Sequence, residues 1–331
     1  MSKKIIIGIS IGDPNGIGLE IIIKSLQKNN FYEELFPVIY CPKKIFLKSL
    51  SILNKKIDFE IIKNPKKAIR GKVNLIAFEE GDFNLSPGKI TKKAGNIALK
   101  SLIKASDDLF NGNIDAIVTA PINKDNIQNI DFNFMGHTEY FTSRCGIEES
   151  LMLMVHNNLR VGLVTNHLPL SKVTKNISKK IIIEKLDIFN SVLKNDFNIK
   201  NPKLALLGLN PHSGDNGLIG KEEKEIIIPT IQEAISKNIN AIGPFPADGF
   251  FANNNHLNYD GILAMYHDQG LIPFKVLSQN KGVNFTAGLP IIRTSPDHGT
   301  GYDISGIGIA NSTSFENALL MAKEIFDSRK K

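Results

Sequence analysis

Three histidines follow apolar runs whose length and β-branched content are typical of buried strands. They lie in Asn166-His167-Leu168-Pro169, Asn210-Pro211-His212-Ser213-Gly214 and Met265-Tyr266-His267-Asp268-Gln269-Gly270. The carboxyl ends of parallel strands meet at one edge of a sheet, so three imidazoles from different strands can converge there. Three imidazoles with an open fourth position form a catalytic zinc site. We therefore expect a shared metal site, with a hydrogen-bonded core histidine as the alternative for each residue taken singly.

A glycine-rich segment, Gly12-Asp13-Pro14-Asn15-Gly16-Ile17-Gly18, follows the first apolar run. Its spacing differs from the G-x-G-x-x-G fingerprint of dinucleotide-binding proteins, and no Gly-Lys-Ser/Thr of a Walker A loop follows it. Glycine relieves backbone strain where a strand turns sharply into a helix. The segment is thus predicted to be a tight strand-to-helix turn, with the wall of an active site as the alternative.

Two further groups carry side chains that can bind anions. His137 and Thr138 could contact a phosphate or carboxylate at a helix start, although Thr138 could also be a simple N-cap. Lys275, Asn284 and Arg293 lie in the last third of the chain, where lysine and arginine on ordered loops can hold an oxyanion. Solvated surface positions are the alternative for these three residues.

The segment from His298 to Gly306 combines several glycines with one acid. Its sequence is His298-Gly299-Thr300-Gly301-Tyr302-Asp303-Ile304-Ser305-Gly306. The carboxylate of Asp303 could hold ribose hydroxyls, and an ordinary surface loop is the alternative.

Short β-branched runs alternate with longer amphipathic stretches, a pattern typical of βαβ units around a mostly parallel sheet. A tight Asn157-Asn158 turn should join two neighbouring strands, and no linker or repeat is visible, so the domain boundary must be a crossing inside the fold. Strands are expected at residues 3–10, 37–41, 116–119, 151–156, 160–166 and 203–209, and helices at 15–28, 91–110, 177–193, 221–236 and 314–329.

The chain has 331 residues, 42% of them apolar, which suggests two domains or one large α/β unit with a divided core. Its cysteines, Cys41 and Cys145, are too few and too far apart for a disulfide framework or a zinc finger, so we expect a cytoplasmic protein. No apolar run is long enough to span a membrane. The net charge of +7 comes from scattered lysines interleaved with acids, which favours an anionic small-molecule substrate over nucleic acid.

Six motifs, in order, resemble those of a known family and cover nearly the whole chain. Six motifs in the same order identify a family far more specifically than any single motif does. The motifs are Gly12-Asp13-Pro14-x-Gly16-Ile17-Gly18, Met135-Gly136-His137-Thr138-Glu139, Leu209-Asn210-Pro211-His212-Ser213-Gly214, Gly243-Pro244-x-Pro246-Ala247-Asp248, Tyr266-His267-Asp268-Gln269-Gly270 and Ser295-x-Asp297-His298-Gly299-Thr300. With these motifs the sequence resembles the 4-hydroxythreonine-4-phosphate dehydrogenases of vitamin B6 synthesis.

This resemblance implies an enzyme that needs a divalent metal (zinc, or magnesium or cobalt) and NAD or NADP. Such an enzyme oxidises 4-phosphooxy-L-threonine to 2-amino-3-oxo-4-phosphooxybutanoate, which decarboxylates to 3-amino-2-oxopropyl phosphate. The implied fold is that of isocitrate and isopropylmalate dehydrogenases, with two α/β/α domains and the active site in the cleft between them. Residues 1–125 with 270–331 would form the cofactor-side domain, and residues 126–269 the domain with the metal ligands and the dimer interface.

The resemblance also implies roles for single residues. His167, His212 and His267 match the metal ligands. A divalent ion held by neutral imidazoles can lower the pKa of a substrate hydroxyl and then stabilise the enolate left by decarboxylation. Asp248 and Asp268 match acids near the metal, and we take Asp248 as the acceptor of the hydroxyl proton.

The matching substrate-binding positions are His137, Thr138, Lys275, Asn284 and Arg293. The loop that starts at His298 resembles the adenosine-binding loop of the superfamily, which needs no G-x-G-x-x-G. Its matching cofactor positions are His298, Gly299, Thr300 and Asp303. The chain departs from the usual family residues at Leu19, Gly301, Tyr302, Ser305 and Ile307, where Pro, Ala, Phe, Ala and Lys are common.

The resemblance implies a homodimer whose subunits share their active sites. Three other functions remain open at this point. The nearest is a paralogous dehydrogenase of a four-carbon sugar-acid phosphate, such as threonate or erythronate 4-phosphate. A metal-dependent hydrolase or phosphotransferase would need only the histidine set, and a basic nucleic-acid-binding module would show a steep salt dependence.

Overall fold

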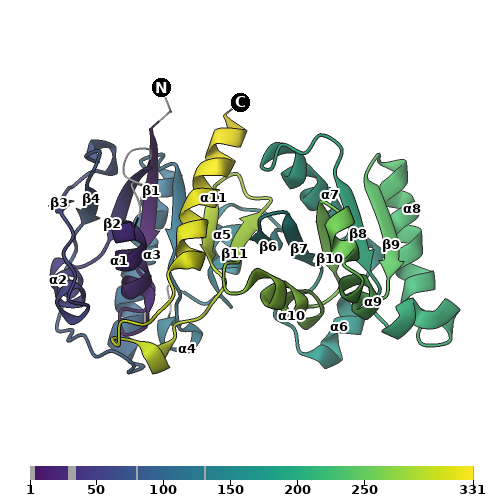
Figure 1. The fold of residues 1–331 in the computed structure, drawn as a ribbon, viewed down its shortest axis with the longest axis horizontal. Helices are drawn as coiled ribbons and strands as arrows, with labels where there is room; N and C mark the ends of the chain where they lie inside the picture. Colours follow the sequence, from purple (N-terminus) through teal and green to yellow (C-terminus); the bar gives the residue numbers. More distant parts are fainter. Residues whose placement is uncertain (1–3, 29–34, 80, 130–131, 331) are drawn as a thin grey trace. The chain divides into compact units, whose positions relative to one another are not determined.

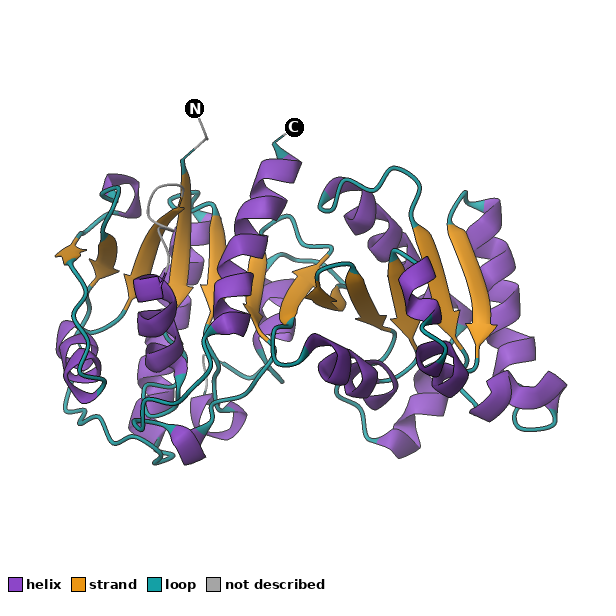
Figure 2. Cartoon of the chain, in the orientation of Figure 1, coloured by secondary structure: helices purple, strands orange, loops and turns teal. Residues whose placement is uncertain are grey.

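The computed structural model describes residues 4–28, 35–79, 81–129 and 132–330. The chain divides into two compact units, one of Met1–Tyr140 with Ile291–Lys330 and the other of Phe141–Pro290. From the sequence we expect residues 126–140 in the second domain and residues 270–290 in the first. In the structure, residues 126–140 belong to the first unit and residues 270–290 to the second. Each unit is an α/β structure built on six hydrogen-bonded strands, which are named the first sheet and the second sheet below, as Figure 1 and Figure 2 show.

The first unit contains a sheet of parallel strands in the order β3-β4-β2-β1-β5-β12. Helix α5 (His137–Arg144) begins in this unit and ends in the second. The other elements are β1 (Ile5–Ser10), α1 (Gly18–Lys28), β2 (Leu35–Tyr40), α2 (Lys43–Ile52), β3 (Phe59–Ile61), β4 (Val73–Ile76), α3 (Lys92–Phe110), β5 (Ala116–Thr119), α4 (Lys124–Ile127), β12 (Arg293–Pro296) and α11 (Thr313–Arg329).

Helices cover both faces of this first sheet (Figure 1). Helix α3 packs on β1, β2 and β5, while α11 packs on β1, β5 and β12 and against α1. Every residue of β1, β2 and β5 is buried, as expected for parallel strands covered on both sides. The side-chain oxygen of Thr91 caps α3 by accepting a hydrogen bond from the Ala94 amide at 3.1 Å.

The second unit contains a mixed sheet in the order β11-β6-β7-β10-β8-β9. Strands β7, β10, β8 and β9 run parallel, whereas β6 is antiparallel to both β7 and β11. Its elements are β6 (Leu151–His156), β7 (Leu159–Leu163), α6 (Leu170–Asn176), α7 (Lys179–Asn195), β8 (Lys203–Leu207), α8 (Ile228–Ser236), β9 (Asn240–Phe245), α9 (Ala247–Ala252), β10 (Gly261–Ala264), α10 (His267–Ser278) and β11 (Val283–Ala287).

A buried cluster joins this second sheet to α9 and α10. Phe250 from α9 and Phe274 from α10 pack with apolar side chains of β6, β7, β8 and β10. The hairpin predicted between 151–156 and 160–166 is confirmed, with Asn157 in the left-handed region at φ 52°. The core of the unit therefore lies directly beneath α10, the helix that begins with His267.

Several boundaries differ from the expected ones for local reasons. Helix α1 begins at Gly18 and not at residue 15, because the glycine-rich turn occupies the preceding residues. The helix expected at 221–236 starts as a π-helical turn, Glu223–Ile227, and becomes α-helical from Ile228, with Pro229 in its first turn. No helix in the described part of the chain is both long and apolar enough to cross a membrane.

Candidate active site

The three predicted metal-binding histidines lie at the same edge of the second sheet. Strands β7, β10 and β8 are adjacent and parallel, and His167, His267 and His212 follow their respective carboxyl ends. The shared strand direction therefore brings all three histidines to one edge, as the sequence predicts.

His167 and His267 come close together, whereas His212 does not complete a three-ligand group. The ring centroids of His167 and His267 are 5.7 Å apart. An ion about 2.0 Å from one nitrogen of each ring would hold the centroids about 5 Å apart, so the pair fits a common divalent ion. Among residues 4–28, 35–79, 81–129 and 132–330, no three His, Cys, Asp or Glu side chains are close enough to hold one ion.

The Tyr266-to-Gly270 motif orients His267 and fixes its loop. Asp268 Oδ1 lies 2.7 Å from His267 Nδ1, which leaves Nε2 as the nitrogen available to a metal. Gln269 accepts a hydrogen bond from the Met265 amide at 2.7 Å and donates one to the Gly208 carbonyl at 2.5 Å. Gln269 thus ties the end of β10 to the end of β8, and Asp268 is placed to orient a ligand.

The segment that carries His212 is held by a buried carboxyl group. Glu223 accepts hydrogen bonds from the backbone amides of Leu209 and Asn210, both at 2.7 Å, and from the Asn210 side chain at 2.9 Å. A Cβ on Gly214 would lie 2.6 Å from Glu223 Oε2, so this position requires glycine. His212 itself adopts a left-handed conformation at φ 53°, a strained backbone for a non-glycine residue.

The other predicted residues of the second unit lie on separate elements. Asp248 is exposed in the first turn of α9, a helix that packs against the segment of His212. Lys275 is exposed in the last turn of α10. Asn284 lies on β11, and its buried Oδ1 accepts no hydrogen bond from any residue that the structure describes. An orphaned buried oxygen of this kind indicates a missing ligand or water.

In the first unit, Arg293 and His137 form a buried polar site. Arg293 on β12 is 2% exposed and donates from Nε and Nη2 to the hydroxyl of Thr119 at 3.2 and 2.7 Å. The alternative that Arg293 is a solvated surface residue is therefore wrong. His137 Nε2 is buried without a hydrogen-bond partner in the described chain. Helix α5 begins at His137, so Thr138 lies inside its first turn and is not the N-cap.

The electrostatics of this site favour an anion. Burial, with the charges of Arg293 and Lys124, holds the pKa of His137 well below 6.5, so its imidazole is neutral near pH 7. Burial lowers the pKa of Arg293 to about 9, while Glu139 opposes the shift, so the guanidinium remains charged. A fixed positive charge beside a neutral imidazole with a free nitrogen suits a phosphate or carboxylate.

The glycine-rich turn after β1 supports the loop that begins at His298. The Ile17 amide donates to the Thr300 carbonyl at 2.8 Å, and a Cβ on Gly16 would lie 2.6 Å from that oxygen. The predicted strand-to-helix turn is confirmed, and it also forms the base of this loop. His298 Nδ1 lies 3.1 Å from the Gly299 carbonyl, and its buried Nε2 has no partner among the described residues, while Asp303 is exposed.

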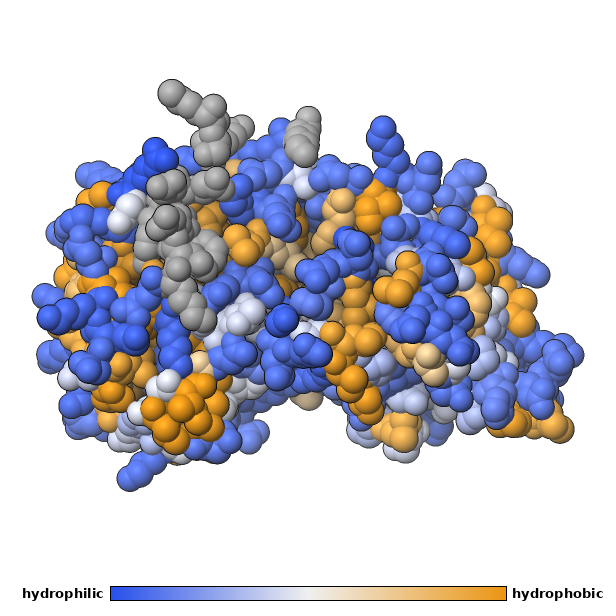
Figure 3. Space-filling model, viewed as in Figure 1, coloured by the Kyte–Doolittle hydropathy of each residue, from blue (hydrophilic) through white to orange (hydrophobic). Residues whose placement is uncertain are grey.

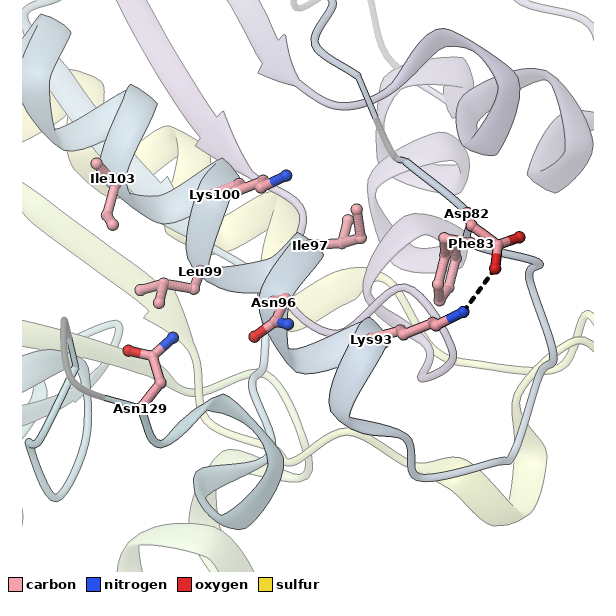
Figure 4. Close-up of a pocket in the computed structure, with 9 residues that line it drawn as sticks. All are labelled: Asp82, Phe83, Lys93, Asn96, Ile97, Leu99, Lys100, Ile103 and Asn129. Carbon is pink, nitrogen blue, oxygen red and sulfur yellow. Dashed lines mark hydrogen bonds and ion pairs between the residues drawn. The ribbon is translucent and has the colours of Figure 1, made fainter.

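A surface pocket of the first unit is lined by other residues. It has a volume of about 430 Å³ and lies along α3, with Phe83 and Asn129 on its walls (Figure 4). Lys93 and Asp82 form an ion pair at 2.9 Å on its wall, which Lys100 also lines, and both partners of the pair are largely exposed. An exposed pair contributes little energy, and none of the predicted site residues lines this pocket.

Three residues that position the site were missed by the sequence analysis: Asp13, Glu223 and Gln269. Asp13 is fully buried at the start of the glycine-rich turn. Asp13 and Gln269 lie inside the motifs, and Glu223 follows the motif of His212. The signal that the sequence offered was therefore a polar side chain close to a candidate ligand. Their partners are set by tertiary contacts, which spacing along the chain does not reveal.

The low pKa of His137 leads to a direct prediction. We expect its imidazole signals in NMR spectra to keep the neutral chemical shift from about pH 7.5 down to about pH 6, because burial and two cations oppose protonation. Comparison with His137→Gln identifies the signal, and the same chain in denaturant should titrate near the ordinary 6.5. Since the unfolded chain takes up this proton first, His137 should reduce stability as the pH falls below that value. A folded-state midpoint near 6.5 would contradict the buried environment.

The chain matches known proteins over almost its entire length. Residues 33–322 match the family model described as "Pyridoxal phosphate biosynthetic protein PdxA". A 4-hydroxythreonine-4-phosphate dehydrogenase of Bacteroides thetaiotaomicron is 45% identical over 99% of this chain and 91% of its own. A candidate D-threonate 4-phosphate dehydrogenase of Oceanobacillus iheyensis is 40% identical over 98% and 99%.

Solved structures agree with this result. The crystal structure of a 4-hydroxythreonine-4-phosphate dehydrogenase from Klebsiella pneumoniae has a TM-score of 0.86 and 34% identity, covering 98% of both chains. A terephthalate 1,2-cis-dihydrodiol dehydrogenase from Burkholderia xenovorans has the same fold, with a TM-score of 0.64 and 22% identity over 97% and 98%. The full-length match to relatives and to the family model establishes that this chain belongs to the PdxA family.

Proposed function

We propose that this protein is an NAD(P)-dependent dehydrogenase of 4-phosphooxy-L-threonine in pyridoxine 5'-phosphate biosynthesis. The product, 2-amino-3-oxo-4-phosphooxybutanoate, would decarboxylate to 3-amino-2-oxopropyl phosphate. The observation that carries the proposal is the 45% identity to a 4-hydroxythreonine-4-phosphate dehydrogenase over 99% of the chain. The buried anion site and the histidines at the sheet edge support it.

We assign the phosphate and polar groups of the substrate to His137, Thr138, Lys275, Asn284 and Arg293. Arg293 supplies a fixed charge in a buried setting, where a charge-assisted hydrogen bond is strongest. The free Nε2 of His137 and the free Oδ1 of Asn284 provide polar atoms whose partners a substrate would supply.

We assign the divalent metal to His167, His212 and His267. The donor set fits, because neutral imidazoles suit zinc, cobalt and similar ions, and two of the rings lie 5.7 Å apart. Asp268 contacts Nδ1 of His267 and leaves Nε2 to hold an ion, and Glu223 holds the segment of His212. Asp268 therefore acts as a positioning residue in this proposal.

Asp248 is our candidate for the base that takes the proton of the substrate hydroxyl. Its exposed carboxyl group lies on α9, next to the segment of His212. The loop of His298, Gly299, Thr300 and Asp303 would hold the dinucleotide, with its backbone fixed on Ile17. A divalent metal held by these histidines would supply a Lewis acid for the reacting oxygen, and a dinucleotide held by this loop would supply a hydride acceptor.

A second candidate substrate is a four-carbon sugar-acid phosphate. The 40% identity to a candidate D-threonate 4-phosphate dehydrogenase of Oceanobacillus iheyensis supports it. The two substrates differ by a hydroxyl in place of an amine, so the same phosphate and metal residues would serve both.

We further propose a homodimer with shared active sites. Several exposed apolar side chains lie on α6, on α10 and in the connecting segments of the second unit: Leu168, Leu170, Leu218, Ile219, Leu257, Ile272 and Val276. Apolar patches are visible on the surface of this unit in Figure 3. Exposed apolar side chains can form a protein interface, and a two-fold dimer would bury the same set on both subunits.

The substrate is tested by following NADH or NADPH formation with matched enzyme. We expect turnover with 4-phosphooxy-L-threonine to exceed turnover with D-threonate and D-erythronate 4-phosphates, and product analysis to show 3-amino-2-oxopropyl phosphate. Faster turnover of a sugar-acid phosphate would establish the second candidate. Hydrolysis of the phosphate without reduction of NAD or NADP would overturn the dehydrogenase proposal.

The metal assignment is tested on the purified protein by metal analysis and activity. His167→Ala and His267→Ala should lose bound metal and nearly all turnover, because each removes one ligand. Asp268→Asn should reduce metal affinity about 10- to 100-fold, as loss of a carboxylate on a ligating histidine does. His156→Ala removes a histidine from the end of β6 and serves as the control, with metal content unchanged. Full metal occupancy in both ligand variants would contradict the assignment.

The shared site is tested by mixing His212→Ala with Arg293→Met subunits after verified exchange. If each site uses residues of both chains, mixed dimers regain one intact site, and activity should approach ~25% of wild type under random pairing. No recovery in verified mixed dimers would place both residues of each site in one chain. An active monomer would rule out a dimer altogether.

A further inference from the structure

We infer that the hydroxyl of Tyr302 is a positioning group that fixes the cofactor loop through the buried carboxyl group of Asp13. The inference rests on the proposed function, in which the loop from His298 to Asp303 holds the nicotinamide dinucleotide. It assigns a role to a hydroxyl that a phenylalanine at this position would lack.

Asp13 is the centre of a compact hydrogen-bond network. Tyr302 donates from its hydroxyl to Asp13 Oδ2 at 2.9 Å, and Asn126 donates from its side-chain amide to the same oxygen at 2.6 Å. The other oxygen, Oδ1, accepts from the Asn15 amide at 2.8 Å. Asp13 is fully buried, so these bonds form where water does not compete.

The network joins three segments that are distant in sequence. Asp13 belongs to the turn after β1, Asn126 to α4, and Tyr302 to a single helical turn, Tyr302–Ile304, within the cofactor loop. Burial and the neighbouring Asp13 raise the pKa of the Tyr302 phenol, so the hydroxyl keeps its proton and acts as the donor.

The rest of the loop is held mainly by its backbone. Thr300 is fixed through its carbonyl by Ile17, and the end of the loop is fixed at Ala310, whose amide donates to Glu20 at 2.7 Å. Gly301, between Thr300 and Tyr302, has φ 51°, a left-handed conformation that favours glycine. Tyr302 thus supplies a side-chain anchor directly after this left-handed residue.

Tyr302→Phe removes this anchor and keeps the aromatic ring. We expect the Kd for NAD or NADP, measured by calorimetry, and the KM for the cofactor to rise about ten-fold, the effect of losing one hydrogen bond to a charged group. The KM for the phosphorylated substrate should change less than about two-fold. Hydrogen exchange of the backbone amides at 298–304 should become faster in the absence of any ligand.

Tyr40→Phe provides the matched control. Tyr40 is also buried in the first unit and donates to a carboxyl group, Asp108 Oδ2, at 2.8 Å. It should reduce stability and leave both cofactor affinity and loop exchange unchanged. Equal effects of the two substitutions, or unchanged Kd and exchange in Tyr302→Phe, would overturn the inference while tight binding by the wild type upholds the proposed function. A wild-type protein that binds neither NAD nor NADP would overturn both.

Discussion

Parallel hydrogen bonding between strands is the constraint on which the site depends. Because β7, β10 and β8 run in one direction, their carboxyl ends form a single edge, and each following loop starts there. The first unit obeys the same rule, since β1, β5 and β12 are adjacent and parallel. The glycine-rich turn after β1 and the loop after β12 thus emerge at the same edge of the sheet.

Strand direction places the loops only approximately, and buried carboxyl groups then fix the conformation of each loop. Asp13 holds the turn after β1, and Glu223 holds the segment of His212, each by accepting several hydrogen bonds at once. A buried carboxyl group without such donors would be costly, so each one restricts its loop to the conformation that satisfies it. Positioning in both units therefore comes from polar side chains that need not touch the substrate.

The expected strands, the expected helices and the common edge of the three histidines are found, because they depend on local pattern and strand direction, whereas β3, β4, β9, β11 and β12 were not among the expected strands. The hairpin at Asn157 and the strand at 116–119 follow from turn chemistry and β-branched residues alone. Burial of Arg293 is not predictable in this way, since a single charged residue gives no periodic signal.

The side chain of Gln269 links two neighbouring strands of the second sheet beyond their last residues. Its side chain makes one bond toward β10 and one toward β8, which amounts to an additional rung between neighbouring strand ends. The spacing between the two loops is thereby set by the interval between strands, about 4.8 Å. These loops lose their conformational entropy when the chain folds. An ion bound there, as we propose, would have less disorder to remove, and its affinity would depend more directly on the ligands themselves.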